Sequence, residues 1–269
     1  MKPNQSSVVL TGAAGGLGSA IARRLHAAGA RVLLVGRNAQ TILALAQSLS
    51  VSAQDRHAVD VLVVDITTAE GRAAIADAAA ARQANVLINN AARAEFGPVQ
   101  ALTQPQMRDL FDTNVIAPML LTASLLPTLL ARPRAQILNI GSVLGSLGVP
   151  GFSAYGASKA ALRIYTESLR RELAGSSVRV QYYAPRAIDT SFNAPEVVAF
   201  NRATGARADA PDAVARFVLH MLEAETPQRF AGPLEALAVR LNTLFPRLLD
   251  SAFSKHRRAL QSPHSGAPS

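Results

Sequence analysis

Short runs of mainly apolar residues alternate along the chain with longer stretches in which apolar residues recur at helical spacing. Short runs that are apolar rather than alternating are typical of strands buried on both faces of a parallel sheet. They fall at residues 7–11, 31–35, 59–64, 85–89, 136–140 and 178–182. Helical patterns between them, such as 17–28 and 39–49, supply the crossovers that parallel strands need. The pattern therefore predicts an α/β protein with a doubly wound parallel sheet.

Two segments interrupt this alternation. Residues 186–209 are rich in Ala, Asn, Thr and Arg without a regular period, which favours a mobile loop or lid. Residues 233–260 carry apolar residues at helical spacing, after a short run at 228–232 that we interpret as a truncated last strand. We therefore expect a single domain over 1–232, an amphipathic helical extension at 233–260 and a flexible tail at 261–269.

Proline divides the C-terminal extension, because it favours the first turn of a helix and breaks a helix interior. Two amphipathic helices are expected, the second beginning at Pro246. Their apolar positions are Leu234, Leu237, Ala238, Leu241, Leu244, Phe245, Leu248, Leu249, Ala252 and Phe253. The accompanying basic residues are Arg240, Arg247, Lys255, Arg257 and Arg258. A basic amphipathic helix is typical of an element that lies on a membrane surface or docks on a partner.

Composition narrows the classes of protein that remain. Of the 269 residues, 49% are hydrophobic and 17% are charged, which excludes a disordered chain. There is no cysteine, which excludes a disulfide framework, thiolate zinc sites and a cysteine nucleophile. The net charge of +9 makes nucleic acid, an anionic membrane and anionic small molecules candidate partners. Aromatic residues make up only 5%, with no Trp, which argues against a protein that stacks nucleic-acid bases.

Neither a membrane span nor a metal site is expected. The N-terminus lacks the apolar region of a signal peptide, which favours a cytoplasmic protein. The longest uncharged stretch, 115–131, contains two prolines and is shorter than the roughly 20 residues of a spanning helix, so we interpret it as a buried core helix. None of the histidines has a histidine or carboxylate partner at ligand spacing.

A glycine-rich sequence, TGAAGGLG at residues 11–18, connects the first predicted strand to the first predicted helix. Glycine permits a tight turn there and lets a pyrophosphate approach the N-terminus of the helix. At the end of the second strand, about 20 residues further, an Asp or Glu would bind the adenosine ribose of NAD. This chain has Gly36-Arg37-Asn38 instead, and Arg37 suits the 2′-phosphate of NADP(H).

Tyr155 and Lys159 lie four residues apart in a helical stretch, so they share one helix face. A neighbouring ammonium lowers the pKa of a tyrosine from about 10 toward neutral pH, which would let Tyr155 act as acid and base. Ser142 follows the fifth predicted strand, at the edge where open α/β sheets bind their ligands. These residues predict a site of proton transfer beside a dinucleotide site.

The ordered set of motifs resembles the short-chain dehydrogenase/reductase family, over roughly residues 5–190. The matches are the glycine-rich loop at 11–18, Asp65 after the third strand and Asn89-Asn90-Ala91-Ala92 after the fourth. Asn114, Ser142, Tyr155 and Lys159 then match the family's catalytic tetrad in order and spacing. The resemblance implies a Rossmann fold and hydride transfer between nicotinamide C4 and a carbonyl or alcohol carbon.

The resemblance also implies a role for each residue. Ser142 would hydrogen-bond the substrate oxygen, and Tyr155 would give or take its proton. Lys159 would lower the pKa of Tyr155 and hold the nicotinamide ribose, while Asn114 would position a water linked to Lys159. Gly12, Gly16 and Gly18 would form the phosphate loop, with Leu17 as its apolar neighbour. The other cofactor contacts would be Arg37, Asp65, Ile66, Asn90, Pro185, Ile188 and Thr190.

Two features depart from the family pattern. After the sixth strand the family has Pro-Gly, whereas this chain has Pro185-Arg186, which is either tolerated in a loop or places a cation near the pyrophosphate or an anionic substrate. The second departure is the C-terminal extension, where relatives have a short Gly-rich end. Its apolar stripe would lie on a membrane, cover the substrate pocket or form a subunit interface, and the sequence leaves these alternatives open.

The function we expect is NADP(H)-dependent interconversion of a carbonyl and an alcohol, on a small hydrophobic substrate and with Tyr155 as acid and base. The alternatives are an epimerase or dehydratase that uses the same residues, and a non-catalytic nucleotide-sensing or membrane-associated scaffold. We expect no nucleic-acid partner. By analogy with relatives, the helices at 115–131 and 155–173 would pair two chains into a homodimer or a tetramer, and 233–258 is the candidate membrane contact.

Overall fold

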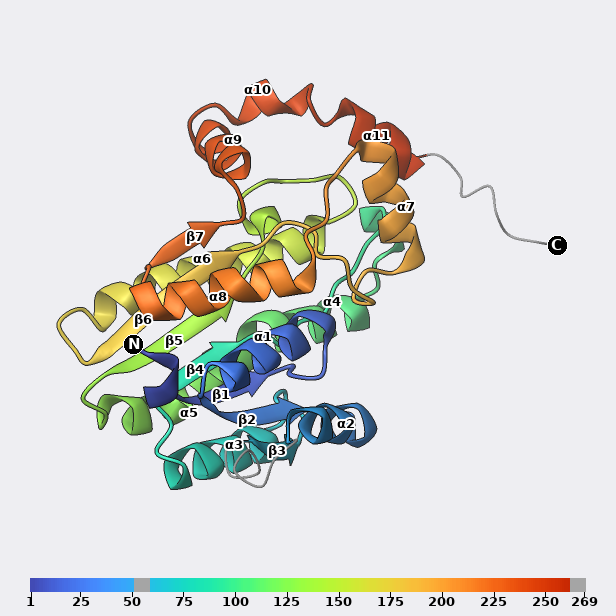
Figure 1. Ribbon diagram of the computed structural model, residues 1–269. Helices are drawn as coiled ribbons and strands as arrows, with labels where there is room; N and C mark the ends of the chain where they lie inside the picture. The colour runs from blue at the N-terminus through green and yellow to red at the C-terminus, as the bar shows by residue number, and fades with distance from the viewer. Residues whose placement is uncertain (51–58, 262–269) are drawn as a thin grey trace.

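The computed structural model describes residues 1–50 and 59–261, without the side chains at positions 248, 249 and 261. Seven parallel strands form one sheet in the order β3-β2-β1-β4-β5-β6-β7 (Figure 1). They are β1 (Ser7–Thr11), β2 (Arg31–Gly36), β3 (Val59–Val63), β4 (Val86–Asn89), β5 (Ala135–Ile140), β6 (Val178–Ala184) and β7 (Gln228–Phe230). The order reverses beside β1, because β3 lies at one edge and β4 follows on the other side of β1. A crevice for a ligand opens at the carboxyl ends of the strands at such a point.

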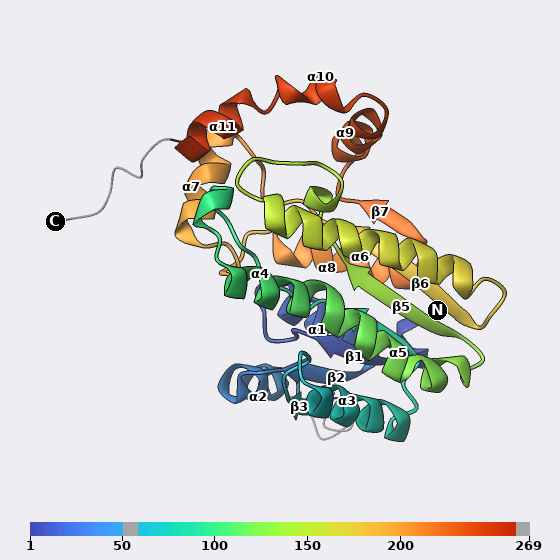
Figure 2. The same cartoon turned by 180° about the vertical axis from the view of Figure 1, so that it is seen from behind.

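Helices cover both faces of the sheet (Figures 1 and 2). One face carries α1 (Gly16–Ala27), α2 (Ala39–Leu49) and α8 (Pro211–Ala224), and the other carries α3 (Ala69–Ala81), α5 (Ala117–Leu130) and α6 (Ser153–Glu172). Successive residues of a strand serve opposite faces, so that Val8 and Leu10 pack with the first group and Val9 with the second. This burial on both sides confirms the predicted doubly wound α/β fold.

The predicted strands lie within two residues of the observed ones at each end. The largest differences, of two residues, are at β7, which ends at Phe230, and at β6, which continues to Ala184 and carries Pro185 to the edge of the ligand crevice. Short 3₁₀ turns occur at η1 (Pro3–Gln5), η3 (Val99–Ala101) and η5 (Val143–Gly145).

The uncharged stretch predicted as a core helix continues from α4 (Gln104–Phe111) through a π-helical turn, η4 (Asp112–Ile116), into α5. In the described part of the chain, this helical run from Gln104 to Leu130 is the one that is long and apolar enough to cross a membrane. Half of its most apolar window is nevertheless buried, and Leu121, Leu125 and Leu129 pack against the sheet. We conclude that it is a core helix of the fold.

The segment 186–209, predicted as a loop without regular structure, contains a helix, α7 (Pro195–Thr204). The prediction overlooked two local signals, a proline in the first turn and Gly205, which ends the helix in the left-handed region at φ +78°. The backbone also ties the two ends of the segment together, because the Asp209 N–H donates to the carbonyl of Ala187 (2.8 Å).

The C-terminal extension contains three helices in its described part rather than the two predicted: α9 (Pro233–Leu244), α10 (Pro246–Asp250) and α11 (Ser254–Gln261). Pro246 begins α10, but the chain turns again at residues 251–253 before α11. The three helices form an arc beyond the carboxyl ends of the strands, with α9 following β7 and α11 beside α7 (Figures 1 and 2). Most of the predicted flexible tail, residues 262–269, lies outside the described residues.

Candidate active site

The glycine-rich loop leaves β1 and enters the N-terminus of α1. Gly12 has φ +63°, a conformation that favours glycine, and a Cβ on Gly16 or Gly18 would overlap Thr190 or the carbonyl of Gly12. The side chain of Asn90, at the end of β4, donates to the carbonyls of Thr11 (3.0 Å) and Gly12 (3.1 Å). The loop is therefore a compact cradle held by the neighbouring strand, and it leaves the amides of the α1 N-terminus open to an anion.

The ends of β2 and β3 bring Arg37 and Asp65 together. The Arg37 guanidinium lies 3.6 Å from the Asp65 carboxylate and is 62% exposed. Burial opposes the ionisation of Asp65, but hydrogen bonds from Thr67 and the charge of Arg37 lower its pKa overall. Asp65 also accepts hydrogen bonds from the amide (2.8 Å) and the hydroxyl (2.7 Å) of Thr67, and its neighbour Ile66 is buried. Arg37 therefore keeps most of its surface available to a ligand at the edge of the crevice.

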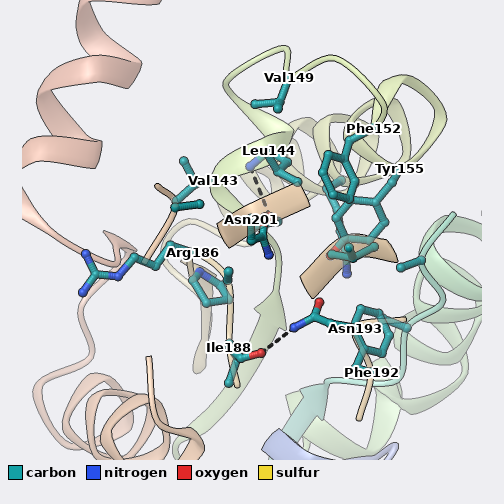
Figure 3. Close-up of a pocket in the computed structure, with 18 of the residues that line it drawn as sticks. Val143, Leu144, Val149, Phe152, Tyr155, Arg186, Ile188, Phe192, Asn193 and Asn201 are labelled. Atoms are coloured by element: carbon teal, nitrogen blue, oxygen red, sulfur yellow. Dashed lines mark hydrogen bonds between the residues drawn. The ribbon is translucent and has the colours of Figure 1, made fainter. Parts of the chain in front are cut away.

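A cavity of about 400 Å³ begins at the glycine loop and extends under the C-terminal extension. Most of the residues predicted from sequence line it, namely Gly12, Leu17, Gly18, Asn90, Ser142, Tyr155, Lys159, Pro185, Ile188 and Thr190. Asn193 of the 186–209 segment donates to the Ile188 carbonyl (2.6 Å) at its wall (Figure 3). The structure thus brings these ten residues to one cavity. Gly16, which lies against the Thr190 side chain, is not part of the lining, and neither are Arg37, Asp65 and Ile66.

Ser142, Tyr155 and Lys159 meet at the floor of the cavity. Ser142 follows β5, and Tyr155 and Lys159 lie one turn apart near the start of α6. The Lys159 ammonium donates to the carbonyl of Ile140 (3.1 Å) and lies 5.8 Å from the centre of the Tyr155 ring. Burial lowers the pKa of Lys159 to about 8.

The pKa of Tyr155 moves in the direction opposite to the expected one. Burial raises it above 10, and a hydrogen bond with the side chain of Ser142 offsets only part of that effect. Phe152 packs beside the Tyr155 ring, with the centres 6.3 Å apart (Figure 3). Tyr155 therefore holds its proton at neutral pH in this structure, which suits a proton donor.

Asn114 lies in the π-helical turn η4, a local irregularity that often marks functional sites. Its side chain is buried, donates to the Arg93 carbonyl (2.9 Å) and to Ser158 Oγ (3.0 Å), and accepts from the Arg93 amide (2.8 Å). These bonds join the segment after β4 to α6 next to Lys159. Asn114 does not itself line the cavity.

Arg186 lines the cavity, where its charge is paired with two carboxylates of this chain. Its guanidinium makes two hydrogen bonds to Asp209 (2.9 and 2.6 Å) and one to Glu235 (2.9 Å). The residue therefore does more than fill a tolerant position in a loop, because two carboxylates partner its charge. It joins the end of β6, the end of the 186–209 segment and the start of α9. We call this contact the Arg186 clamp.

The sequence did not identify the cavity's outer wall. It is built from aromatic and aliphatic side chains, including Leu144, Val149, Phe152, Phe200, Phe253 and His256. The His256 ring, on α11, lies 5.7 Å from the ring of Phe200 on α7 and 5.0 Å from that of Phe253. Burial and the charge of Lys255 lower the pKa of His256. Of these wall residues, Phe253 could have been found from the sequence, because it belongs to the periodic apolar pattern of the extension. α11 therefore covers the cavity.

Comparison with known proteins identifies the family to which the chain belongs. The family model for short chain dehydrogenases matches residues 6–198. The chain belongs to the short-chain dehydrogenase/reductase family. It is therefore an NAD(P)-dependent oxidoreductase, and the glycine loop at the N-terminus of α1 fits the pyrophosphate of such a cofactor.

Two curated members of this family illustrate the range of its relatives. The chain is 33% identical to the bovine dehydrogenase/reductase SDR family member 7B over 274 residues, which cover 96% of this chain and 83% of that protein. It is 36% identical to sulfoacetaldehyde reductase 2 of Chromohalobacter salexigens over 189 residues, covering 69% of this chain and 73% of that one. A solved short-chain dehydrogenase from Sphingobium yanoikuyae in complex with NADPH superposes with a TM-score of 0.76 at 28% identity, covering 98% of each chain.

Proposed function

We propose that this short-chain dehydrogenase/reductase interconverts a carbonyl and an alcohol with NADP(H), and that Tyr155 transfers the proton. The observation that carries the proposal is the common cavity. It contains the glycine loop at one end and brings Ser142, which follows β5, together with Tyr155 and Lys159 of α6, where the Lys159 ammonium lies 5.8 Å from the centre of the Tyr155 ring. A proton donor next to a second hydrogen-bond donor is what the reduction of a carbonyl requires.

The reduced nicotinamide, when bound, supplies the hydride that is added to the carbonyl carbon. Ser142 hydrogen-bonds the carbonyl oxygen and polarises it. Tyr155 gives its proton to that oxygen as the negative charge develops, and takes the proton back when the alcohol is oxidised. Lys159 stabilises the tyrosinate left by reduction, and its ammonium would hold the cofactor ribose. Asn114 fixes the start of α6 and positions a water next to Lys159.

The preference for NADP(H) rests on Arg37. No carboxylate follows Gly36 at the end of β2, so the ribose 2′-OH would lack its usual acceptor. Arg37 is largely exposed and its contact with Asp65 is long at 3.6 Å, so its guanidinium can turn to a 2′-phosphate. The solved relative bound to NADPH supports the same choice.

The substrate we propose is a hydrophobic ketone or aldehyde. Beyond Ser142 and Tyr155, the wall formed by Leu144, Phe152 and Phe200 offers apolar contacts and few hydrogen-bond partners. A chain of methylene groups would gain binding energy there in proportion to the area that it buries.

The test of this function is Tyr155→Phe, which removes the acidic hydroxyl and keeps the ring. The rate of NADPH oxidation with a ketone panel should fall by about 10²–10⁴-fold, the usual contribution of a general acid. NADPH affinity, measured by fluorescence titration, should change little. Substantial residual turnover would refute the role of Tyr155, and turnover without net NADPH consumption would indicate an epimerase or dehydratase.

We also propose a homodimer formed through α5 and α6. Exposed apolar side chains on this side are Leu120 on α5, Ile164 on α6 and Ile116, the last residue of η4 before α5. Sedimentation velocity of the wild type should give the mass of two chains, and Ile164→Glu should shift it toward one. A wild type that sediments as a monomer would contradict the proposal.

A further inference from the structure

The helix α9 packs on the protein through one face. Glu235 belongs to the Arg186 clamp, Val239 packs on the cluster around Val143 and Tyr182, and the Asn242 side chain donates to the Ser146 carbonyl (3.0 Å). Positions 235, 239 and 242 lie on the same side of a helix with 3.6 residues per turn. This side is therefore fixed against the domain.

The opposite face of α9 is apolar and exposed. Its side chains are between 41% and 76% exposed, and they recur at the spacing of a single stripe. They are Leu234, Leu237, Leu241, Leu244 and Phe245. We call this set the α9 stripe. An amphipathic helix of a soluble domain normally buries its apolar face, and α9 does the reverse, with its more polar side toward the domain. The stripe therefore has no partner among the described residues.

Cations accompany the apolar side chains along the extension from α9 to α11. Residues 236–261 contain five basic side chains and a single acidic one, Asp250. Arg240, Arg247, Lys255 and Arg257 are exposed, and none of these four makes an ion pair with a carboxylate of the described residues. Charges of one sign beside apolar side chains require a partner that offers both hydrocarbon and negative charge.

We propose that the α9 stripe docks on the surface of an anionic lipid bilayer. Leucine and phenylalanine side chains enter the boundary between headgroups and acyl chains, while arginine and lysine attract the lipid phosphates and carboxylates. A second copy of this chain fits less well. A two-fold contact through the stripe would place the same cations of both copies side by side, where they repel.

Docking through α9 places the cavity next to the lipid. The chain runs directly from α9 through α10 to Phe253 and His256, which cover the cavity, and Glu235 at the start of α9 lines it as well. A hydrophobic substrate dissolved in the bilayer would reach the cavity without crossing bulk water. The docking itself requires neither cofactor nor catalysis, so it stands or falls separately from the proposed function.

The test is co-sedimentation of the full-length protein with phosphatidylcholine vesicles that do or do not contain phosphatidylserine. The wild type should bind the anionic vesicles and bind the neutral ones much more weakly. Leu237→Ser should lower the partition coefficient by about tenfold through the lost apolar contact. Arg240→Glu, which reverses one charge, should lower it by about tenfold on anionic vesicles only.

Matched control variants distinguish the effect of the α9 stripe from that of an exposed apolar side chain or a cation elsewhere on the surface. Leu43 on α2 is 49% exposed, close to the 52% of Leu237, and Arg108 on α4 is an exposed cation that makes no ion pair with a carboxylate in the described part of the chain. Leu43→Ser and Arg108→Glu should change binding by less than about twofold. Turnover of a water-soluble ketone without vesicles should be the same in all four variants.

Two results would overturn the proposal. The first is a wild type that does not bind anionic vesicles; if Leu237→Ser then also lowers the sedimentation mass, the stripe is a contact between copies of the chain. The second is equal loss of binding in the α9 variants and in their controls.

Discussion

The Arg186 clamp allows a quantitative prediction, because one side chain joins three segments that are far apart in sequence. Arg186→Met keeps the aliphatic stem and removes the charge, which leaves Asp209 and Glu235 without their shared partner. The three residues are partly buried, with side chains between 21% and 30% exposed. Their hydrogen bonds are therefore screened less than those of a surface pair, and solvent still reduces their strength.

The expected loss follows from these contacts. A hydrogen bond to a charged group contributes about 1.5–3 kcal/mol, and exposed ion pairs contribute about 0–1 kcal/mol. For a partly exposed clamp we expect Arg186→Met to lower the free energy of unfolding by about 2 kcal/mol. In a domain of this size that corresponds to a fall in Tm of about 4–8 °C. The KM for the carbonyl substrate should rise as well, because the clamp holds α9 and the 186–209 segment at the cavity.

The assay is thermal unfolding by circular dichroism, beside steady-state kinetics. Arg24→Met is the matched control, since Arg24 also makes two hydrogen bonds to one carboxylate, that of Asp212, but that carboxylate is 64% exposed. Its Tm should fall by less than about 3 °C. Arg186→Lys should restore only part of the stability, because an ammonium lacks the fork that reaches two carboxylates. If Arg186→Met unfolds no earlier than Arg24→Met and keeps its KM, the clamp contributes nothing.

Three further predictions concern the cofactor and Lys159. Arg37→Ala should lower kcat/KM for NADPH by about 30-fold, because the lost contact with the 2′-phosphate contributes about 2 kcal/mol of binding free energy. The kcat/KM for NADH should stay nearly unchanged, and equal effects on the two cofactors would exclude a 2′-phosphate contact. The pKa of Lys159 is about 8 in the folded protein and 10.5 for an ordinary lysine. Between these two pH values Lys159 is therefore protonated in the unfolded chain and deprotonated in the folded one. The free energy of unfolding should therefore rise with pH over that interval, by up to about 1.4 kcal/mol per pH unit, and urea titrations of Lys159→Met should lack this rise. Gly18→Ala should weaken NADPH binding in fluorescence titrations, since its methyl group would overlap the Gly12 carbonyl and displace the loop, whereas Gly148→Ala, in open space, should not.

The sequence was sufficient for features that depend on neighbouring positions along the chain. A parallel strand that is buried on both faces is apolar along its whole length, so β1 and β2 could be predicted from short runs of apolar residues. The glycine loop and the pair of Tyr155 and Lys159 were likewise visible, because a turn and one helix face are local geometries. The convergence of these motifs on one cavity followed from the parallel sheet, which brings the ends of all its strands to the same edge.

The sequence could not predict contacts between residues that are far apart along the chain. Arg186 is 23 positions from Asp209 and 49 from Glu235, and nothing near Arg186 in the sequence announces either carboxylate. The extension shows the same difficulty in another form. Its periodicity predicts helices with an apolar side, but the period alone cannot say which side meets the domain. In the structure the end of the extension covers the cavity, whereas α9 turns its apolar side outward.

The direction in which the pKa of Tyr155 shifts could not be predicted for the same reason, because residues distant in the sequence cause it. From the sequence, the nearest charge was Lys159, so the expected effect was electrostatic and lowered the pKa. In the structure Tyr155 belongs to an apolar cluster with Phe152 and Phe200, against which Leu260 of α11 packs. Desolvation by that cluster exceeds the effect of any nearby group and raises the pKa. Since α7 and α11 complete the cluster, the segments whose structure was hardest to predict from the sequence also raise the pKa of the proposed acid. Any change that detaches α11 should therefore lower the pKa of Tyr155 toward its ordinary value.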